Sequence, residues 1–355
     1  MSEVDTPTER RARAHTAITR GAVAMHPSEN GESSDDMDAF LDEFEHSPLP
    51  DPLSLAQLEK ALRVVADGVL PVAPPKIKSA LKRDLKLGYP DDLVMRDMQE
   101  TSCETLFVSF CSLTESGHRQ QEFCGTAKRA GVSHALFLCD PLQAWFLRAD
   151  TAFGSVLSLV LFEIERLKPS RVVCVGASMG GYAAIRCGIA LGRRPSTDAS
   201  APAPNRLKSV VVIAFGPQVF IDPSERAAIG LPPVSFNPAL NRLHFAARAL
   251  NLPLHSLVHL ASRAISDAQL GGPHALVEVH VEVHVGELAG SDVREARLLE
   301  LAISQAQRAE ESVPHVERQA TSWTVAVQVH QGSGHTIAAD LKSRGQLDTI
   351  VRAHV

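Results

Sequence analysis

The sequence predicts an α/β fold in which a mostly parallel sheet carries helices on both faces. From Thr105 onward, short apolar runs rich in β-branched residues alternate with longer segments of helical periodicity. This alternation is typical of a parallel sheet that is covered on both faces. The chain has 355 residues, of which 45% are hydrophobic and 21% are charged. Such a chain can bury one large core, so one main domain is expected.

The N-terminal third is expected to lie outside that domain. Residues 1–50 contain few large apolar side chains, so they bury too little surface to offset the entropy of the chain, and we expect a disordered tail. Residues 51–104 are expected to form a helical N-terminal extension, because a helical pattern begins near Leu53 after a Pro-rich stretch. The main domain is then expected to span residues 105–355.

Six strands and five helical segments are expected in this main domain. The strands are the apolar runs 106–111, 135–139, 171–175, 209–214, 277–285 and 323–329. The helical candidates cover 119–130, 153–167, 179–191, 293–308 and 336–353, and each is long enough for a right-handed crossover between parallel strands.

One segment, residues 217–273, interrupts the alternation after the strand that ends near Ala214. It contains helical patches but no strand pattern, so we expect a helical insertion there. A cap over an active site and a purely structural helical excursion are equal alternatives for this segment.

Composition excludes several classes of protein. The formal net charge of -6 and the pI near 6.2 argue against a nucleic-acid partner, because affinity for phosphates depends on clustered Lys and Arg. Six cysteines without close pairs indicate free thiols, and neither a metal site nor a cofactor is expected. No run reaches the roughly 18 apolar residues of a membrane span, and the first residues lack a signal peptide. We expect a cytoplasmic protein with a small-molecule substrate; the sequence leaves its oligomeric state open.

The most informative segment is residues 171–185, where an apolar strand runs into Gly176-Ala-Ser-Met-Gly180 and then into a helix of small residues. A nucleophile at the tip of a sharp turn needs strained backbone angles, and the residues two before and two after it must be almost free of side-chain atoms. Gly176 and Gly180 meet that requirement. A Gly-rich turn that cradles an anion, without a nucleophile, is the alternative.

This G-x-S-x-G turn between strand and helix resembles the nucleophile elbow of the α/β-hydrolase superfamily. The resemblance covers residues 105–355, and the run Phe215-Gly-Pro-Gln218 and a C-terminal Gly-His pattern resemble a little-characterised subgroup. It implies a serine hydrolase in which Ser178 attacks an acyl ester or thioester of a small molecule and forms an acyl-enzyme. A hydrolase-fold protein that binds or scaffolds without turnover is the alternative.

In this superfamily the acid and then the histidine follow the serine along the chain. His335 ends a Gly-rich loop after the last expected strand, which makes it the candidate base, with His330 as the reserve. The loop after the preceding strand contains Asp292, the candidate acid, and Glu287, its alternative. Asp292 also suits the N-cap of the helix that follows.

An oxyanion hole needs two backbone N–H donors. The resemblance implies Met179, directly after the serine, and a residue after an early strand, for which Ser112 is the candidate. The HGGG-type signature of lipases and carboxylesterases is absent from this sequence.

A second polar pattern lies in the expected strand 277–285, where His280 and His284 alternate with valines. These residues share one face with Glu278 and Glu282. A metal site could be drawn from the four side chains, but the exposed face of an edge strand is the simpler interpretation.

Overall fold

The computed structural model describes ten segments of the chain. They are residues 94–98, 103–113, 122–140, 145–147, 153–192, 207–231, 254, 256–270, 277–311 and 322–355. All of them belong to one compact unit, Pro48–Val355. The tail expected over residues 1–50 lies outside the described residues.

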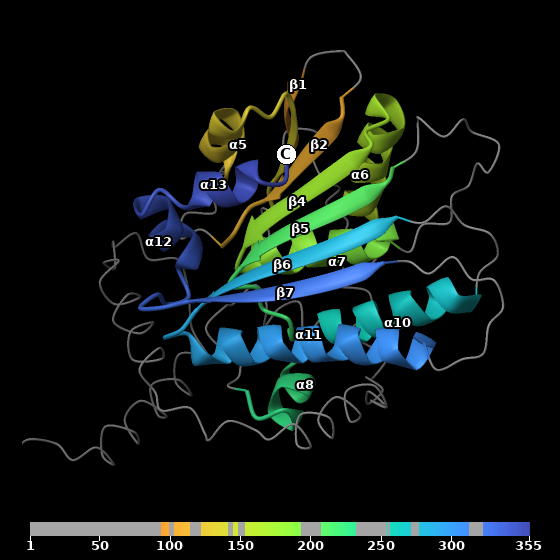
Figure 1. Ribbon diagram of the computed structural model, residues 1–355, viewed down its shortest axis with the longest axis vertical. Coiled ribbons are helices and arrows are strands. Elements are labelled where there is room, and N and C mark those ends of the chain that lie inside the picture. Colours follow the sequence, from red (N-terminus) through yellow and green to blue (C-terminus); the bar gives the residue numbers. More distant parts are fainter. Residues whose placement is uncertain are drawn as a thin grey trace, which may run out of the picture. The chain divides into compact units, whose positions relative to one another are not determined.

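The fold is built on a seven-stranded sheet of order β1-β3-β2-β4-β5-β6-β7, in which only β1 is antiparallel to its neighbour (Figure 1). The strands are β1 (Val94–Met98), β2 (Thr105–Phe110), β3 (His134–Leu138), β4 (Arg171–Ala177), β5 (Ser209–Phe215), β6 (Glu278–Gly286) and β7 (Trp323–His330). The six strands expected from the apolar runs are confirmed to within two residues at either end, and the mostly parallel sheet is confirmed with them.

Strand β1 was not expected, because residues 51–104 were assigned to a helical extension. Val94–Met98 instead pairs antiparallel with β3, from Val94 opposite Leu138 to Met98 opposite His134. The five residues include Arg96 and Asp97, so they lack the apolar run that identifies a buried strand. This segment forms a strand because its backbone pairs with the edge of β3. The rest of 51–104, apart from Cys103 and Glu104, lies outside the described residues.

Helices cover both faces of the sheet (Figure 1). One face carries α5 (Cys124–Ala130), α12 (Ile337–Ser343) and α13 (Leu347–Arg352). The other carries α6 (Gly154–Leu167), α7 (Met179–Gly192), α10 (Leu257–Leu270) and α11 (Gly290–Glu311). The helix expected over 336–353 is therefore two helices, because the chain turns at Gly345, whose φ of 69° lies in the left-handed region. No helix among these described segments has the length and apolar character of a membrane span.

Each face of the sheet has its own apolar core. Because successive strand residues point to opposite faces, Val172 and Cys174 of β4 join the core beneath α6, α7, α10 and α11. Val173 and Val175 join the smaller core beneath α5, α12 and α13. The central strands are thus buried on both sides, which is why they appear in the sequence as continuous apolar runs.

The described part of the expected insertion comprises α8 (Pro223–Ala228) and α10. Helix α10 packs against α7 and α11, and it buries Leu257, Ala261 and Ile265 in the main core. This helix therefore belongs to the layer that covers the sheet. Residues 232–253 lie outside the described residues, so a cap over the site stays a prediction.

The polar pattern of β6 does not lie at an edge, because β6 lies between β5 and β7. The interpretation as an exposed face of an edge strand was wrong. His284 is buried, stacks on Phe215, and its Nδ1 lies 2.9 Å from His330 Nε2. Glu282 bonds His284 and His354, and both bonds lower the pKa of its carboxyl group. The C-terminal residues supply the partners that make this polar face stable inside the fold.

Helix α8 leads to a prediction about pH. Burial, followed by the charge of Asp222, raises the pKa of the Glu225 carboxyl from 4.5 to about 8, and within the described residues no donor reaches its Oε2. Between those two values the unfolded chain releases this proton while the folded chain keeps it. The free energy of unfolding should therefore fall as pH rises from about 5 to about 8, by up to about 1.4 kcal/mol per pH unit.

The variant Glu225→Gln should remove this dependence, because its amide does not titrate. Urea unfolding at pH 5, 7 and 9 measures the effect. We expect the variant to gain stability relative to the parent as pH rises. If the free energy of unfolding changed with pH in the same way for the parent and for Glu225→Gln, the prediction would be wrong.

Candidate active site

Ser178 lies at the tip of the turn between β4 and α7, with the strained backbone that the sequence predicted. Its φ of 49° lies in the left-handed region, which residues other than glycine rarely adopt. A Cβ atom on Gly176 would overlap the carbonyl of Gly180, and one on Gly180 would overlap the carbonyl of Phe110. The Ser178 N–H donates to Phe215 O at 2.8 Å, which anchors the turn to β5.

His335 reaches this serine from the loop between β7 and α12. Its Nε2 lies 3.1 Å from Ser178 Oγ, although 157 positions separate the two residues. The His335 side chain is 32% exposed, so the ring is accessible from solvent. His330, the reserve candidate, lies at the end of β7 and contacts His284 instead.

Asp292 lies on the other side of the His335 ring. Its Oδ2 is 2.6 Å from His335 Nδ1, and its side chain is almost fully buried. Glu287, the alternative acid, is exposed and accepts the Gly332 N–H at 3.3 Å. Of the two candidates, the structure brings Asp292 to the histidine.

The expected position of Asp292 needs a correction, because the residue is not on a loop. Helix α11 begins at Gly290 instead of residue 293, so Asp292 lies in its first turn. A carboxylate there is stabilised by the unpaired N–H groups and by the dipole of a long helix. The helix holds the carboxylate more rigidly than a loop would.

Gly216 is a residue of the site that the sequence did not identify, although it belongs to the run Phe215-Gly-Pro-Gln218 on which the resemblance partly rests. A Cβ atom there would lie 3.0 Å from His335 O and 3.3 Å from Asp292 Oδ2. Its φ is 51°. The glycine therefore lets the end of β5 approach the His335–Asp292 pair. Only the folded arrangement of strand ends reveals this requirement.

A buried ion pair lies one turn along α11 from Asp292. Glu295 accepts the backbone N–H groups of Val219 and Phe220 at 2.6 and 3.0 Å, and Arg226 Nη1 bonds it at 2.6 Å. Burial raises the pKa of the Glu295 carboxyl, and the Arg226 charge opposes that effect. These bonds tie the segment after β5 to the helix that carries Asp292.

The segment after β3 is held in a comparable way. Asp140 Oδ2 accepts the Phe146 N–H at 2.8 Å, and Trp145 Nε1 donates to Gln218 Oε1 at 2.7 Å. Trp145 and Phe146 are buried with positive φ values of 55° and 57°. Asp140 thus bonds within the segment that follows β3, and Trp145 joins this segment to the one that follows β5.

The two expected oxyanion donors differ in their surroundings. Met179 is the first residue of α7, so its N–H has no partner within that helix. The Ser112 N–H donates to Glu122 Oε2 at 2.5 Å. The second candidate donor is therefore already engaged by a carboxyl group.

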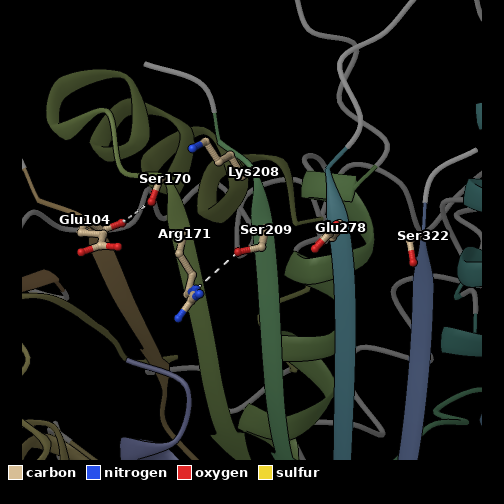
Figure 2. A pocket seen from close by; sticks show the side chains of 7 residues that line it. All are labelled: Glu104, Ser170, Arg171, Lys208, Ser209, Glu278 and Ser322. Atoms are coloured by element: carbon tan, nitrogen blue, oxygen red, sulfur yellow. Dashed lines mark hydrogen bonds between the residues drawn. The ribbon is translucent and has the colours of Figure 1, made fainter. Parts of the chain in front are cut away.

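One hollow among the described residues lies away from this site. It has a volume of about 520 Å³ and is formed at the amino ends of the strands, as Figure 2 shows. Its lining residues are Glu104, Ser170, Arg171, Lys208, Ser209, Glu278 and Ser322. Ser178 lies at the carboxyl end of β4 and Arg171 at its amino end, so this hollow is on the opposite edge from the candidate site.

The described segments contain no group of three or more His, Cys, Asp or Glu residues that could hold a metal ion. All six cysteines are free thiols, and four of them are buried. Burial raises the pKa of the Cys103 thiol, which keeps that sulfur protonated and a poor nucleophile. Ser178, His335 and Asp292 are the polar side chains that the structure brings together at the candidate site.

A mostly parallel sheet with helices on both faces, whose central strand runs through a G-x-S-x-G turn into a helix, defines the α/β-hydrolase fold. The chain has this fold. No family model and no curated protein matches the sequence.

Several solved structures resemble the chain at low identity. The capsule O-acetyltransferase of Neisseria meningitidis serogroup A is 10% identical over 74% of this chain and 93% of its own, with a TM-score of 0.46. The monoacylglycerol lipase of Paleococcus ferrophilus is 13% identical over 74% and 98%, with a TM-score of 0.39. The S-formylglutathione hydrolase of Agrobacterium tumefaciens is 16% identical over 72% and 84%, with a TM-score of 0.36. Because these identities and TM-scores are low, the fold assignment rests on the strand order of the sheet and on the G-x-S-x-G turn after β4.

Proposed function

We propose that this protein is a serine hydrolase that acts on an acyl ester or thioester of a small molecule. Ser178 is the nucleophile, His335 the general base and Asp292 the orienting acid. The observation that carries the proposal is the pair of contacts made by one imidazole ring, 3.1 Å to Ser178 Oγ and 2.6 Å to Asp292 Oδ2. A serine hydroxyl is a weak nucleophile, and this arrangement supplies the base that it needs.

In the first half of the reaction Ser178 Oγ bonds to the carbonyl carbon of the substrate. Its proton passes to His335 Nε2, while Nδ1–H donates to the Asp292 carboxylate, which stabilises the imidazolium. The carbonyl oxygen takes the electron pair and becomes an oxyanion near the Met179 N–H. When the C–O or C–S bond breaks, the leaving alcohol or thiol takes the proton from His335, and an acyl-enzyme remains.

In the second half a water molecule attacks the acyl-enzyme. His335 takes a proton from the water, and the oxygen of the water bonds to the acyl carbon. The bond from that carbon to Ser178 Oγ then breaks, and the serine regains its proton from His335. The products are a carboxylic acid and the alcohol or thiol, and no cofactor is required.

The alternative is a protein that binds its ligand on the same fold without turnover. The imidazole placed 3.1 Å from Ser178 Oγ favours the enzyme, because a serine nucleophile needs an adjacent base to take its proton. A binding protein has no need of a base placed on the serine.

A fluorophosphonate probe tests the proposal directly, because it reacts covalently with activated serines. We expect the probe to label the parent protein at Ser178 and to leave Ser178→Ala unlabelled, as mass spectrometry of the modified peptide would show. Ser224, an exposed serine on α8, provides the matched control, and Ser224→Ala should label as the parent does. Equal labelling of the parent and Ser178→Ala would refute the assignment.

A further inference from the structure

The carboxyl group of Glu122 accepts a hydrogen bond from the backbone N–H group that the proposed reaction needs. Its Oε2 accepts the Ser112 N–H at 2.5 Å, which is short for an N–H···O bond. Glu122 lies two residues before the start of α5 and ten positions after Ser112.

The packing of Gly180 places the end of β2 next to the site. A Cβ atom on Gly180 would overlap Phe110 O and would lie 2.8 Å from Cys111 O, so the end of β2 lies against the first turn of α7. Ser112 is the next residue along the chain. Ser112 therefore follows a strand end that packs against the first turn of α7, whose Met179 N–H is the first expected donor, and the fold takes the second oxyanion donor from such a position.

The contact is held from two sides. The Ser109 hydroxyl, which is buried, donates to the Glu122 main-chain oxygen at 2.6 Å. The neighbouring Phe123 adopts φ of 63° and buries its ring against Phe215. The main chain of Glu122 is therefore anchored, while its side chain ends on Ser112.

An N–H group carries one proton, so the carboxylate and an oxyanion compete for it. The two groups would also repel each other, because both are negative and both would lie within hydrogen-bond reach of one nitrogen. Burial raises the pKa of the Glu122 carboxyl, while the bond from Ser112 opposes that effect. The free protein thus keeps an acidic group at the position where negative charge must develop.

We propose that Glu122 gates the oxyanion hole: its carboxyl group occupies the Ser112 N–H in the free protein and must leave before turnover. This inference rests on the proposed function. The gate keeps the oxyanion hole incomplete until the negative charge that develops in the chemical step displaces the side chain. Glu122 then limits the rate of the chemical step, whereas it has little effect on the binding of an uncharged ester.

The test compares Glu122→Gln and Glu122→Ala with the parent in the hydrolysis of p-nitrophenyl acetate. Glutamine keeps the shape of the side chain but removes the charge, and alanine removes the acceptor altogether. We expect kcat to rise in both variants, by about tenfold or more, while KM stays within about twofold, because one oxyanion donor is worth about 10²–10³ in kcat. Glu278→Gln, an exposed glutamate at the amino end of β6, is the matched control and should leave both constants unchanged.

A fall of kcat in both variants would overturn the gate and would mean that Glu122 positions the Ser112 peptide. Unchanged constants would also overturn it. If Glu122→Ala does not fold, the nearly isosteric Glu122→Gln decides the question alone. Ser178→Ala, measured in parallel, separates the two proposals: parent activity that survives this change refutes the proposed function, whereas activity that depends on Ser178 but not on Glu122 refutes only the gate.

Discussion

Replacing Asp292 by Asn is expected to lower kcat by about 10³–10⁴-fold. The amide keeps the size of the side chain, but it can donate a proton where the carboxylate only accepts one. His335 Nδ1, 2.6 Å from Asp292 Oδ2, would then hold the wrong tautomer and could no longer leave Nε2 free as a base. Steady-state hydrolysis of a short p-nitrophenyl ester measures the loss.

Glu287→Gln is the matched control for Asp292→Asn. Glu287 is exposed, and its contact is a 3.3 Å bond from the Gly332 N–H, so we expect a change of kcat within about twofold. A larger loss in Glu287→Gln than in Asp292→Asn would transfer the acid's role to Glu287. The thermal midpoint of both variants should be recorded, since Asp292 is buried in the first turn of α11 and its replacement also affects stability.

Replacing Gly286 by Ala is expected to cost most of the activity, although residue 286 touches no substrate. A Cβ atom there would overlap the carbonyl oxygens of Ser333 and Gly334, which directly precede His335. Those are backbone atoms and cannot rotate away, so the loop must shift. A shift of about 1 Å at a catalytic group can cost about 10²-fold in rate.

The measurement for Gly286→Ala is again kcat for a short p-nitrophenyl ester, together with circular dichroism to show that the sheet is retained. Gly332→Ala is the control, because nothing lies within 4 Å of a Cβ atom at that position in the same loop, although its φ of 66° adds some strain. We expect the control to retain far more activity than Gly286→Ala. Equal losses would show that the loop tolerates no change, whatever the contact.

Much of the fold could be read from the sequence because its strands are buried on both faces. Val172 to Val175 alternate between two apolar cores, so every residue of the run is apolar and the strand is easily recognised. Strand β1 has no such run, and its pairing with β3 defines it. The same reasoning misjudged β6, because an alternating polar pattern looks the same on an exposed edge and in a central strand whose polar side chains bond to partners such as His330 and His354.

For the candidate site, too, some features follow from the local sequence and others only from the tertiary structure. The serine turn was predictable from the sequence, because a sharp turn between strand and helix needs glycine at both flanking positions, and this need is local. His335 was predictable from its place after the last strand. The sequence favoured Asp292 over Glu287, but only the structure shows where α11 begins and which side chain reaches His335 Nδ1 across the sheet edge.

By itself, then, the sequence determined the elements that depend on neighbours in the chain: the buried strands, the helices between them, and the turn that presents Ser178. The tertiary structure alone decided the contacts between residues far apart in sequence, such as Gly216 beside the His335–Asp292 pair and Glu122 on the Ser112 N–H. The physical reason is that propensity and periodicity act over a few residues. Hydrogen bonds and steric limits at a site act between strand ends, whose positions exist only once the sheet has formed.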